Sequence, residues 1–327
     1  MNTKEFKAHP LLPGGQLQTL AGYFLSPPPA VAADEFIYVA LPDGDKIELV
    51  INNPKGPVTA TLYLLHGLGG DSDSGYKLRL TKKLLPLGYR IIRHNHRGNG
   101  VHGNEAKGMY HSGSAVDVLE CLKEIARRYP ENPLGIIGFS LSGTIVLNLL
   151  AWYAKELEDL GLLKAAMSVC APIDLEESSR ALSQLRNKHY DLFFAKTAIE
   201  QFHRRRFISD DQAKTYLHRP SLRKIDEHVT APYGGFRDAS HYYDECSPKH
   251  TLSQISIDTL ILAAADDPIV PAQSVLKAPI QHPVKLRMET SGGHMGFLGR
   301  HLTTHGDYRW LDTFVENWAQ SKFKAVQ

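Results

Sequence analysis

The sequence predicts an α/β fold in which a mostly parallel central sheet is covered by helices on both faces. The first observation is that apolar runs of strand length alternate with helical patterns from residue 60 to residue 170, as expected for βαβ units. The second is that the alternation resumes at residue 259. The third is a length of 327 residues without an obvious internal repeat, which suits one domain with an insertion.

The chain enters this sheet through a predicted β-hairpin. Residues 36–41 and 46–52 have strand patterns and are joined at Asp43-Gly44, a strong turn signal. The alternation then predicts strands over residues 60–65, 89–93, 134–139 and 164–170, with helices over 76–87, 114–129 and 141–154. Near the end of the chain it predicts strands over 259–264 and 284–289, and helices near 273–277 and over 308–320.

Residues 171–248 interrupt the alternation. This segment is rich in charge, histidine and aromatic residues with helical spacing, and it has no clear strand. We therefore expect a single domain over residues 1–327, with residues 171–248 forming an inserted helical cap. Its apolar residues could line an acyl groove as well as pack a core, namely Leu182, Leu185, Leu192, Phe193, Phe194, Ile199 and Phe202.

Composition and charge exclude several classes of protein. The 43% hydrophobic and 22% charged residues are typical of soluble globular domains. A net charge of +2 and one short basic cluster, residues 203–206, give no basic face for nucleic acid. The longest uncharged run, residues 135–154, approaches the length of a membrane span but contains three glycines and two serines. We interpret it as a buried strand followed by a buried helix, so no integral membrane segment is expected.

The cysteines favour a reducing compartment. Cys121, Cys170 and Cys246 lie far apart without CxxC spacing, so neither a disulfide framework nor a structural zinc site is predicted. Residues 1–15 include charged side chains but no apolar stretch of the kind found in secretory signals. We therefore expect a cytoplasmic protein. The oligomeric state is left open.

The sharpest local signal is Gly138-Phe139-Ser140-Leu141-Ser142-Gly143, a pattern of the G-x-S-x-G type with Ser140 as its central serine. An apolar strand precedes it and an apolar helix follows it, as in a nucleophile elbow. Such a strained turn needs small neighbours at Gly138 and Gly143 and projects the serine hydroxyl out of the sheet. The helix N-terminus adds positive potential where negative charge develops. We predict Ser140 as the nucleophile. Ser142 is the competing hydroxyl, but it lies beyond the elbow.

A serine nucleophile needs a base, and the base needs a carboxylate that orients it. In this kind of enzyme the chain order is serine, acid, histidine. The strand at 259–264 ends in Asp266-Asp267-Pro268, at the strand end where parallel sheets place their sites. We prefer Asp267 because it directly precedes the Pro268 turn, with Asp266 as the alternative. Both acids could instead cap the following helix.

The base is predicted to be His294. It lies in the glycine-flanked loop Ser291-Gly292-Gly293-His294 that follows the last strand, and such a loop lets an imidazole reach over the sheet. The sequence contains 16 histidines, but His282, His301 and His305 lack this setting.

Two backbone N–H groups are needed to bind the oxyanion. One belongs to Leu141, the residue after the nucleophile. The loop His66-Gly67-Leu68-Gly69-Gly70 follows an earlier strand, and we assign the second donor to Leu68. We expect His66 to orient this loop rather than to take part in catalysis.

Two other patterns are given structural interpretations. His94 and His96 could share a strand face as metal ligands, with His102 and His111 nearby, but no HExxH motif or carboxylate accompanies them at a convincing spacing. The glycines at 98, 100, 103 and 108 lack the strand and helix that flank a dinucleotide-binding motif. We therefore predict no metal and no cofactor.

Taken together, the motifs resemble the YheT-like branch of the α/β hydrolases, also called family 4 of the AB-hydrolases. The resemblance covers nearly the whole chain and rests on His9-Pro10, Gln18-Thr19-Leu20, His66-Gly67-Leu68-Gly69-Gly70, Arg97-Gly98, Tyr110-His111-Ser112-Gly113, Asp117, the Ser140 elbow, Pro232, Gly235-Phe236, Tyr242-Tyr243, Asp266-Asp267-Pro268 and the His294 loop. Asn99-Gly100 and the pair His94 and His96 depart from the family pattern.

The resemblance implies an α/β-hydrolase fold and a carboxylic ester hydrolase that acts on acyl esters or lipids, with a triad at Ser140, Asp267 and His294. From the residues themselves we expect cleavage through an acyl-enzyme, with short to medium acyl chains preferred. Two alternatives stay open at this point. One is an amidase or thioesterase with the same triad, and the other is a non-catalytic binding protein on a hydrolase scaffold.

Overall fold

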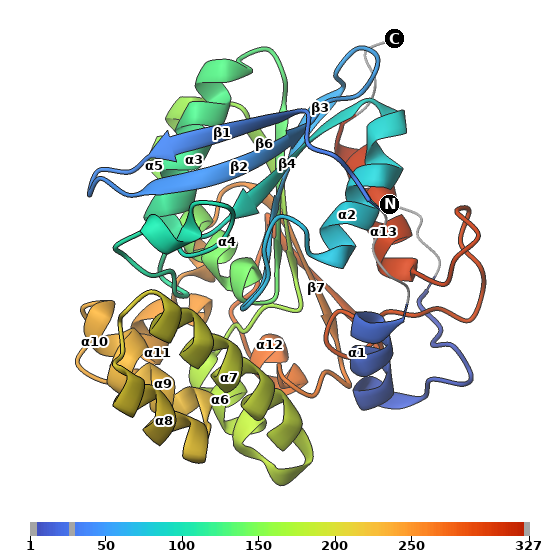
Figure 1. Cartoon of the computed structure of the whole chain (residues 1–327). Coiled ribbons are helices and arrows are strands. Elements are labelled where there is room, and N and C mark those ends of the chain that lie inside the picture. The colour runs from blue at the N-terminus through green and yellow to red at the C-terminus, as the bar shows by residue number, and fades with distance from the viewer. Residues whose placement is uncertain (1–4, 26–29, 324–327) are drawn as a thin grey trace.

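The computed structural model describes residues 5–25 and 30–323, which form an eight-stranded sheet in the order β1-β2-β4-β3-β5-β6-β7-β8 (Figure 1). Strand β2 runs antiparallel to β1 and β4, and the other pairings are parallel. The predicted fold class is therefore confirmed. The strands are β1 (Glu35–Ala40), β2 (Lys46–Asn52), β3 (Ala60–Leu65), β4 (Tyr89–Asn95), β5 (Leu134–Phe139), β6 (Leu163–Val169), β7 (Asp258–Ala264) and β8 (Val284–Glu289).

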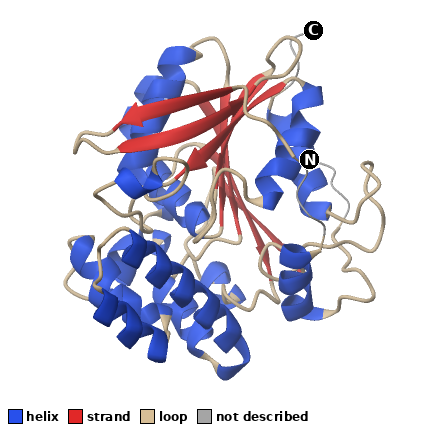
Figure 2. Cartoon of the chain, in the orientation of Figure 1, coloured by secondary structure: helices blue, strands red, loops and turns tan. Residues whose placement is uncertain are grey.

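Helices cover both faces of the sheet (Figure 2). On one face α2 (Gly75–Leu84) packs against α13 (Trp310–Lys322). On the other face α3 (Ala115–Arg128) packs against α4 (Leu141–Trp152), and α5 (Ala154–Leu160) contacts both. The short helix α12 (Ala272–Leu276) follows β7. Short 3-10 turns lie at Leu85–Leu87, Gly103–Glu105, Leu185–Asn187, Pro248–His250 and Leu252–Gln254.

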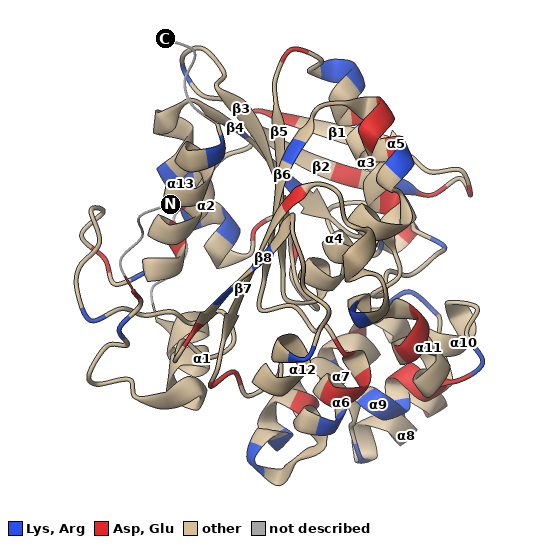
Figure 3. Cartoon of the chain, turned by 180° about the vertical axis from the view of Figure 1, so that it is seen from behind, with Lys and Arg blue, Asp and Glu red and all other residues tan. Residues whose placement is uncertain are grey.

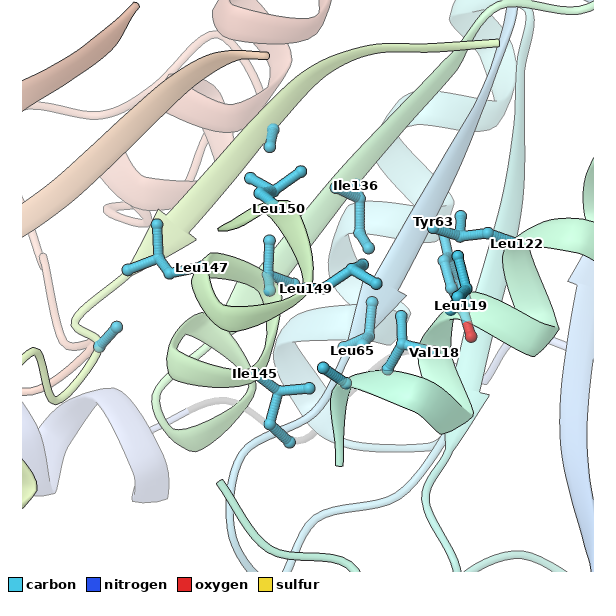
Figure 4. Packing of buried hydrophobic residues seen from close by; sticks show 14 of the residues in the cluster. Tyr63, Leu65, Val118, Leu119, Leu122, Ile136, Ile145, Leu147, Leu149 and Leu150 are labelled. Atoms are coloured by element: carbon cyan, nitrogen blue, oxygen red, sulfur yellow. The ribbon is translucent and has the colours of Figure 1, made fainter. Parts of the chain in front are cut away.

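The central strands are buried on both sides, which explains their continuous apolar sequence. All six residues of β3 are buried, and its apolar side chains are divided between two core clusters. Tyr63 and Leu65 pack with residues of α3 and α4 (Figure 4). Leu62 and Leu64 pack on the opposite face, in the cluster that contains Trp318 of α13. Because successive side chains of a strand point to opposite faces, β3 packs against the helices on both sides of the sheet.

The segment between β6 and β7 contains helices and no strand, and its helices gather on one side of the molecule (Figure 1). We call this segment, Leu175–Gln254, the helical insertion. Its helices are α6 (Leu175–Ser183), α7 (Lys188–Arg204), α8 (Asp210–His218), α9 (Leu222–Ile225), a π-helical turn (Asp226–Thr230), α10 (Ala231–Tyr233) and α11 (Ala239–Cys246). Part of its apolar surface packs into small clusters, one of which joins Ile199, Phe202 and Ile225 to Met109 from outside the segment.

Outside the helical insertion, α1 and α5 were not predicted from the sequence. Helix α1 (Gly14–Phe24) follows the Pro/Gly-rich start of the chain, and its buried residues are Gly15, Gln18 and Thr19. An apolar stripe with helical spacing is the usual signal for a helix, and this helix instead buries glycine and polar side chains. The polar contacts that hold it are made with the C-terminal part of the chain, as described below.

Acidic and basic residues are interspersed over the outer helices rather than segregated by sign (Figure 3). Among residues 5–25 and 30–323, no helix has the length and apolar character needed to cross a membrane.

A buried arginine ties the β1–β2 hairpin to the rest of the fold. The guanidinium of Arg97 donates two hydrogen bonds to Asp117 of α3, at 2.7 and 2.8 Å, and one to Asp45 at 2.7 Å. A further bond reaches Asp43 in the turn at 2.5 Å. The side chains of Asp45 and Asp117 are only 3% and 5% exposed, so Arg97 compensates two buried charges. Asp45 also accepts the backbone N–H groups of Lys107 and Gly108, at 2.8 and 2.7 Å.

Replacing Arg97 by methionine should therefore destabilise the protein by about 3–5 kcal/mol, because it leaves two buried carboxylates unpaired. Arg97→Lys should recover part of this loss, since an ammonium keeps the charge but cannot reproduce the forked geometry. Urea unfolding measures both. Lys155→Met, which breaks an exposed pair with Asp159, is the control and should cost less than about 1 kcal/mol. A similar loss in Arg97→Met and Lys155→Met would contradict the interpretation.

Candidate active site

Ser140 occupies a strained turn between β5 and α4. Its φ is 54° and its ψ is −122°, a conformation that side-chain-bearing residues rarely adopt. The surrounding residues must be small. A Cβ at Gly138 would collide with the backbone carbonyl of Ser142, and one at Gly143 would lie 2.7 Å from both Ala171 and Ser168. The turn therefore places the Ser140 hydroxyl beyond the carboxyl end of the sheet, at the start of α4.

The structure brings the three residues of the predicted triad together. The Oγ atom of Ser140 lies 2.8 Å from Nε2 of His294. The other ring nitrogen, Nδ1, lies 2.9 Å from Oδ2 of Asp267. His294 is 9% exposed, so the hydrogen-bonded series is shielded from water while its serine end faces a pocket. This geometry allows the imidazole to take a proton from the serine.

The structure distinguishes the two neighbouring acids. Oδ2 of Asp267 accepts a hydrogen bond from Nδ1 of His294. Its Oδ1 accepts the backbone N–H groups of Ile269 and Val270, at 2.8 and 3.0 Å. Asp266 instead accepts the backbone N–H of Gly293 at 2.8 Å, and burial raises the pKa of its carboxyl. Asp267 thus orients the ring, and Asp266 holds the loop on which the ring is carried.

Helix α1 supports the same loop from the other side. The Thr19 hydroxyl accepts the backbone N–H of His294 at 2.8 Å, and the Gln18 amide pairs with the backbone of Leu298 through bonds of 2.7 and 3.1 Å. A Cβ at Gly22 would lie 2.7 Å from Cα of Gly296. Residue patterns alone did not predict these supports. The sequence signal for these supports was Gln18-Thr19-Leu20, which is recognisable through the family resemblance and not from the residue pattern.

The predicted oxyanion donors face the pocket next to Ser140. Leu68 and Leu141 both line it. In the loop after β3, the N–H of Gly67 donates to Tyr76 and that of Gly69 donates to Tyr110, at 3.2 and 3.1 Å. The N–H groups of Leu68 and Leu141 have no hydrogen-bond acceptor among the described residues. Two free donors beside the hydroxyl suit the binding of an oxyanion.

A buried chain of hydrogen bonds runs beneath this turn, and the sequence did not reveal it. The Tyr63 hydroxyl lies 2.5 Å from Nδ1 of His94, whose Nε2 lies 2.9 Å from Nδ1 of His96. Nε2 of His96 lies 2.7 Å from the Ser142 hydroxyl, which in turn donates to the backbone oxygen of His66. The chain therefore links the elbow helix to the loop that carries Leu68.

The directions of these bonds follow from the Ser142 hydroxyl. Because its proton is donated to His66, it must accept a proton from Nε2 of His96. Nδ1 of His96 then accepts from His94, and Nδ1 of His94 accepts from Tyr63. This scheme needs neutral rings, and burial supplies the condition: it lowers the pKa of His96 to about 3 and that of His94 well below its usual value.

His66 has the loop-orienting contacts that the sequence suggested. Its Nδ1 lies 2.8 Å from the backbone oxygen of Gly67, and its Nε2 accepts the backbone N–H of His96 at 3.2 Å. Burial lowers its pKa well below the usual value. The neutral ring therefore connects the end of β3 to the end of β4 through hydrogen bonds.

His94 and His96 bind each other and their neighbours, so their ring nitrogens are already used. Within the described residues, one group brings three possible metal ligands within 4.8 Å, namely Cys170, Asp267 and His294. Two of these are paired with each other, and burial raises the pKa of the Cys170 thiol well above its usual value. A protonated thiol is a poor metal ligand. The absence of a metal and of a cofactor stays a prediction.

The pocket beside Ser140 has an empty volume of about 840 Å³, including the space at its open mouth. One wall is apolar and comes largely from the helical insertion. Of the residues proposed from the sequence for an acyl groove, Leu182, Phe194 and Phe202 line it. Leu185 and Phe193 are instead 91% and 46% exposed. Of the seven apolar residues proposed for the acyl groove, only these three therefore lie in the pocket wall.

Similar proteins share the fold and much of the length. Residues 60–300 match the sequence model of the family described as "alpha/beta hydrolase fold". The chain is 30% identical to "Putative esterase YheT" of Escherichia coli (strain K12) over 87% of this chain and 84% of that protein. It is 28% identical to "Phospholipase ABHD3" of Bos taurus over 86% and 70% of the two chains. Among solved structures, the Pyrococcus furiosus esterase Pf2001 has a TM-score of 0.54 at 15% identity, with 90% of this chain and 96% of that chain covered.

The two acids should differ sharply when each is changed to its amide. Asp267→Asn should lower kcat for ester hydrolysis about ten-thousandfold, because an amide favours the wrong tautomer of His294. Asp266→Asn keeps an acceptor oxygen for Gly293 and should cost less than about tenfold. Steady-state kinetics of the two variants side by side makes the comparison. A larger loss in Asp266→Asn would reverse the assignment.

The buried chain should matter both for stability and for turnover. Ser142→Ala leaves the His66 oxygen and the His96 ring N–H without partners, which should cost about 1–3 kcal/mol in urea unfolding. It should also lower kcat with little change in KM, since the loop that carries Leu68 loses an anchor. The control is Ser168→Ala, because the buried Ser168 hydroxyl has no partner in the described structure. Reduced stability with unchanged kcat in Ser142→Ala would show that the chain is structural alone.

Proposed function

Because the chain belongs to the YheT-like branch of the α/β-hydrolase family, we propose that it hydrolyses carboxylic esters with Ser140, His294 and Asp267 as its catalytic triad. It is a carboxylic ester hydrolase of the esterase or lipase type, like the relatives that it resembles. The single observation that carries the triad is the continuous series from Asp267 through His294 to Ser140, with links of 2.9 and 2.8 Å.

In the proposed mechanism, His294 Nε2 removes the proton of the Ser140 hydroxyl as Oγ attacks the ester carbonyl carbon. The carbonyl oxygen becomes an oxyanion, which accepts hydrogen bonds from the N–H groups of Leu68 and Leu141. When the tetrahedral intermediate collapses, His294 returns the proton to the leaving alcohol and an acyl-enzyme remains.

Water then releases the acyl group by the same route. His294 takes a proton from the water as its oxygen attacks the acyl carbon, and returns that proton to Oγ as the carboxylic acid leaves. Asp267 stays ionised throughout and stabilises the imidazolium that forms twice in each cycle. Its additional bonds from Ile269 and Val270 keep its carboxylate in place for this role.

We propose that the helical insertion caps the site and that the acyl chain lies in the pocket it walls. Leu182, Phe194 and Phe202 offer apolar contact to such a chain. A partly enclosed pocket of this kind favours short to medium acyl chains, and it also suits the acyl part of a lipid ester. A phospholipase and a monoacylglycerol lipase among the relatives are consistent with this class of substrate.

The cysteines fit the location expected from the sequence. Cys121, Cys170 and Cys246 are buried free thiols, which is usual for a protein kept in a reducing compartment. We therefore retain a cytoplasmic location as part of the proposal.

Hydrolysis of a p-nitrophenyl ester series, from acetate to palmitate, tests the proposal directly. Ser140→Ala should lose turnover to the background level, a fall of about a millionfold in kcat, because removing the nucleophile disables the whole triad. The wild type should prefer short to medium chains over palmitate. Ser253→Ala, at an exposed position in the turn before β7, is the control and should behave as the wild type.

Two outcomes would contradict parts of this proposal. Full activity in Ser140→Ala would remove Ser140 from the mechanism, and equal turnover of acetate and palmitate would contradict an enclosed pocket. If the wild type leaves the esters intact, matched amide and thioester substrates and a fluorophosphonate probe distinguish another hydrolase from a scaffold without catalysis.

A further inference from the structure

The pocket that adjoins Ser140 is polar on the side formed by three parts of the helical insertion. Helix α6 contributes Ser178, the π-helical turn contributes Asp226 and Thr230, and α11 contributes Tyr243. The rest of the insertion's contribution includes Leu182, Phe194, Phe202 and Leu222. An acyl chain needs only apolar contacts, so it does not account for a carboxyl group and hydroxyl groups in the same pocket.

Asp226 is the most informative of these residues. It is 8% exposed, and Oδ2 accepts the Tyr243 hydroxyl at 2.6 Å. A carboxylate offers about four acceptor positions, so this bond leaves capacity for a ligand. Burial raises the pKa of Asp226 to about 6, while the neighbouring Tyr243 and Thr230 hydroxyls lower it. The group that the triad does not use is therefore a buried acceptor beside the substrate pocket.

Two independent features indicate that this part of the pocket is built for a ligand. The first is the backbone, since Asp226–Thr230 forms a π-helical turn, a rare conformation that is frequent at functional sites. The second is Ser178, which is 4% exposed and lines the pocket while its hydroxyl has no hydrogen-bond partner among the described residues. A buried hydroxyl without a partner is costly unless a ligand or water completes its bonding.

We propose that Asp226 and Ser178 form a subsite for a hydroxyl group on the acyl chain, so that the substrates are esters of hydroxylated fatty acids. This inference rests on the proposed function, because it places the acyl chain in the same pocket. A substrate hydroxyl would donate to the Asp226 carboxylate and accept from the Ser178 hydroxyl. An ammonium group can only donate, and it would also have to leave water for an apolar passage. A hydroxyl therefore matches the pair of residues better.

The experiment compares matched p-nitrophenyl esters whose acyl chains end in a methyl, a hydroxyl, a methoxy or an ammonium group, in lengths from butanoate to dodecanoate. The readout is the ratio of kcat/KM for the hydroxyl ester to kcat/KM for the methyl ester. In the wild type this ratio should rise about tenfold to hundredfold at the chain length that reaches Asp226, and not at shorter lengths. The methoxy ester, which cannot donate, should not show the rise.

The variants assign the effect to the two residues. Asp226→Asn keeps an acceptor of lower strength and should reduce the ratio about tenfold, and Ser178→Ala should reduce it by a smaller factor. Asp244→Asn, an exposed acid on α11, is the matched control and should leave the ratio unchanged. Since each ratio is taken within one enzyme, a partial loss of folded protein in Asp226→Asn does not affect it.

The outcomes separate this inference from the proposed function. If the wild type hydrolyses the methyl-ended esters and the ratio stays near one at every length, the subsite is wrong and the esterase stands. A ratio that rises equally for hydroxyl and methoxy esters, or one that both variants leave unchanged, also overturns the subsite. Preference for the ammonium ester would replace the hydroxyl by a cation. If no ester is hydrolysed, the proposed function fails and the inference fails with it.

Discussion

The positive φ of Ser140 is the constraint on which the rest of the site depends. A serine held at φ 54° between β5 and α4 stores strain, so the surrounding structure must enforce it. Three glycines make that possible. Gly138 and Gly143 let the strand and helix meet without side chains between them, and a Cβ at Gly67 would lie 3.0 Å from that of Ser140. The close approach of Gly67 also brings the β3 loop, with the free N–H group of Leu68, next to Ser140.

The buried hydrogen-bond chain fixes the spacing between these parts. Ser142 lies in the first turn of α4, His66 follows β3, and His96 follows β4, so a single hydroxyl joins three elements. A buried polar network is costly if any group is left unpaired, and it specifies one geometry when every link is made. The links through His94 and His96 need neutral imidazole rings. Burial keeps both rings neutral because it lowers their pKa values. The pair that resembled metal ligands in the sequence is thus part of the support for the turn.

Local pattern was enough to predict the sheet, because strands such as β3 and β5 are buried on both faces and read as continuous apolar runs. The triad residues could be proposed from their positions after strands β5, β7 and β8, and the structure brings them within hydrogen-bonding distance. Helix α1 was missed because its buried face is glycine, Gln18 and Thr19, whose partners lie more than 270 residues away. The choice between Asp266 and Asp267 also needed tertiary contacts, since both follow the same strand.

The hydrogen bonds around Ser140 and the apolar wall of the pocket come from different parts of the chain. The proposed triad joins Ser140, Asp267 and His294, and the loop of His294 is braced by Thr19 of α1, so its geometry draws on both the start and the end of the chain. Much of the apolar pocket wall is carried by the helical insertion, which has a small core of its own around Tyr242 and packs against the main core through Leu182 and Phe194. In the proposed function, the chemistry is therefore placed by the sheet and its loops, whereas the apolar wall that would contact the acyl group comes largely from the helical insertion.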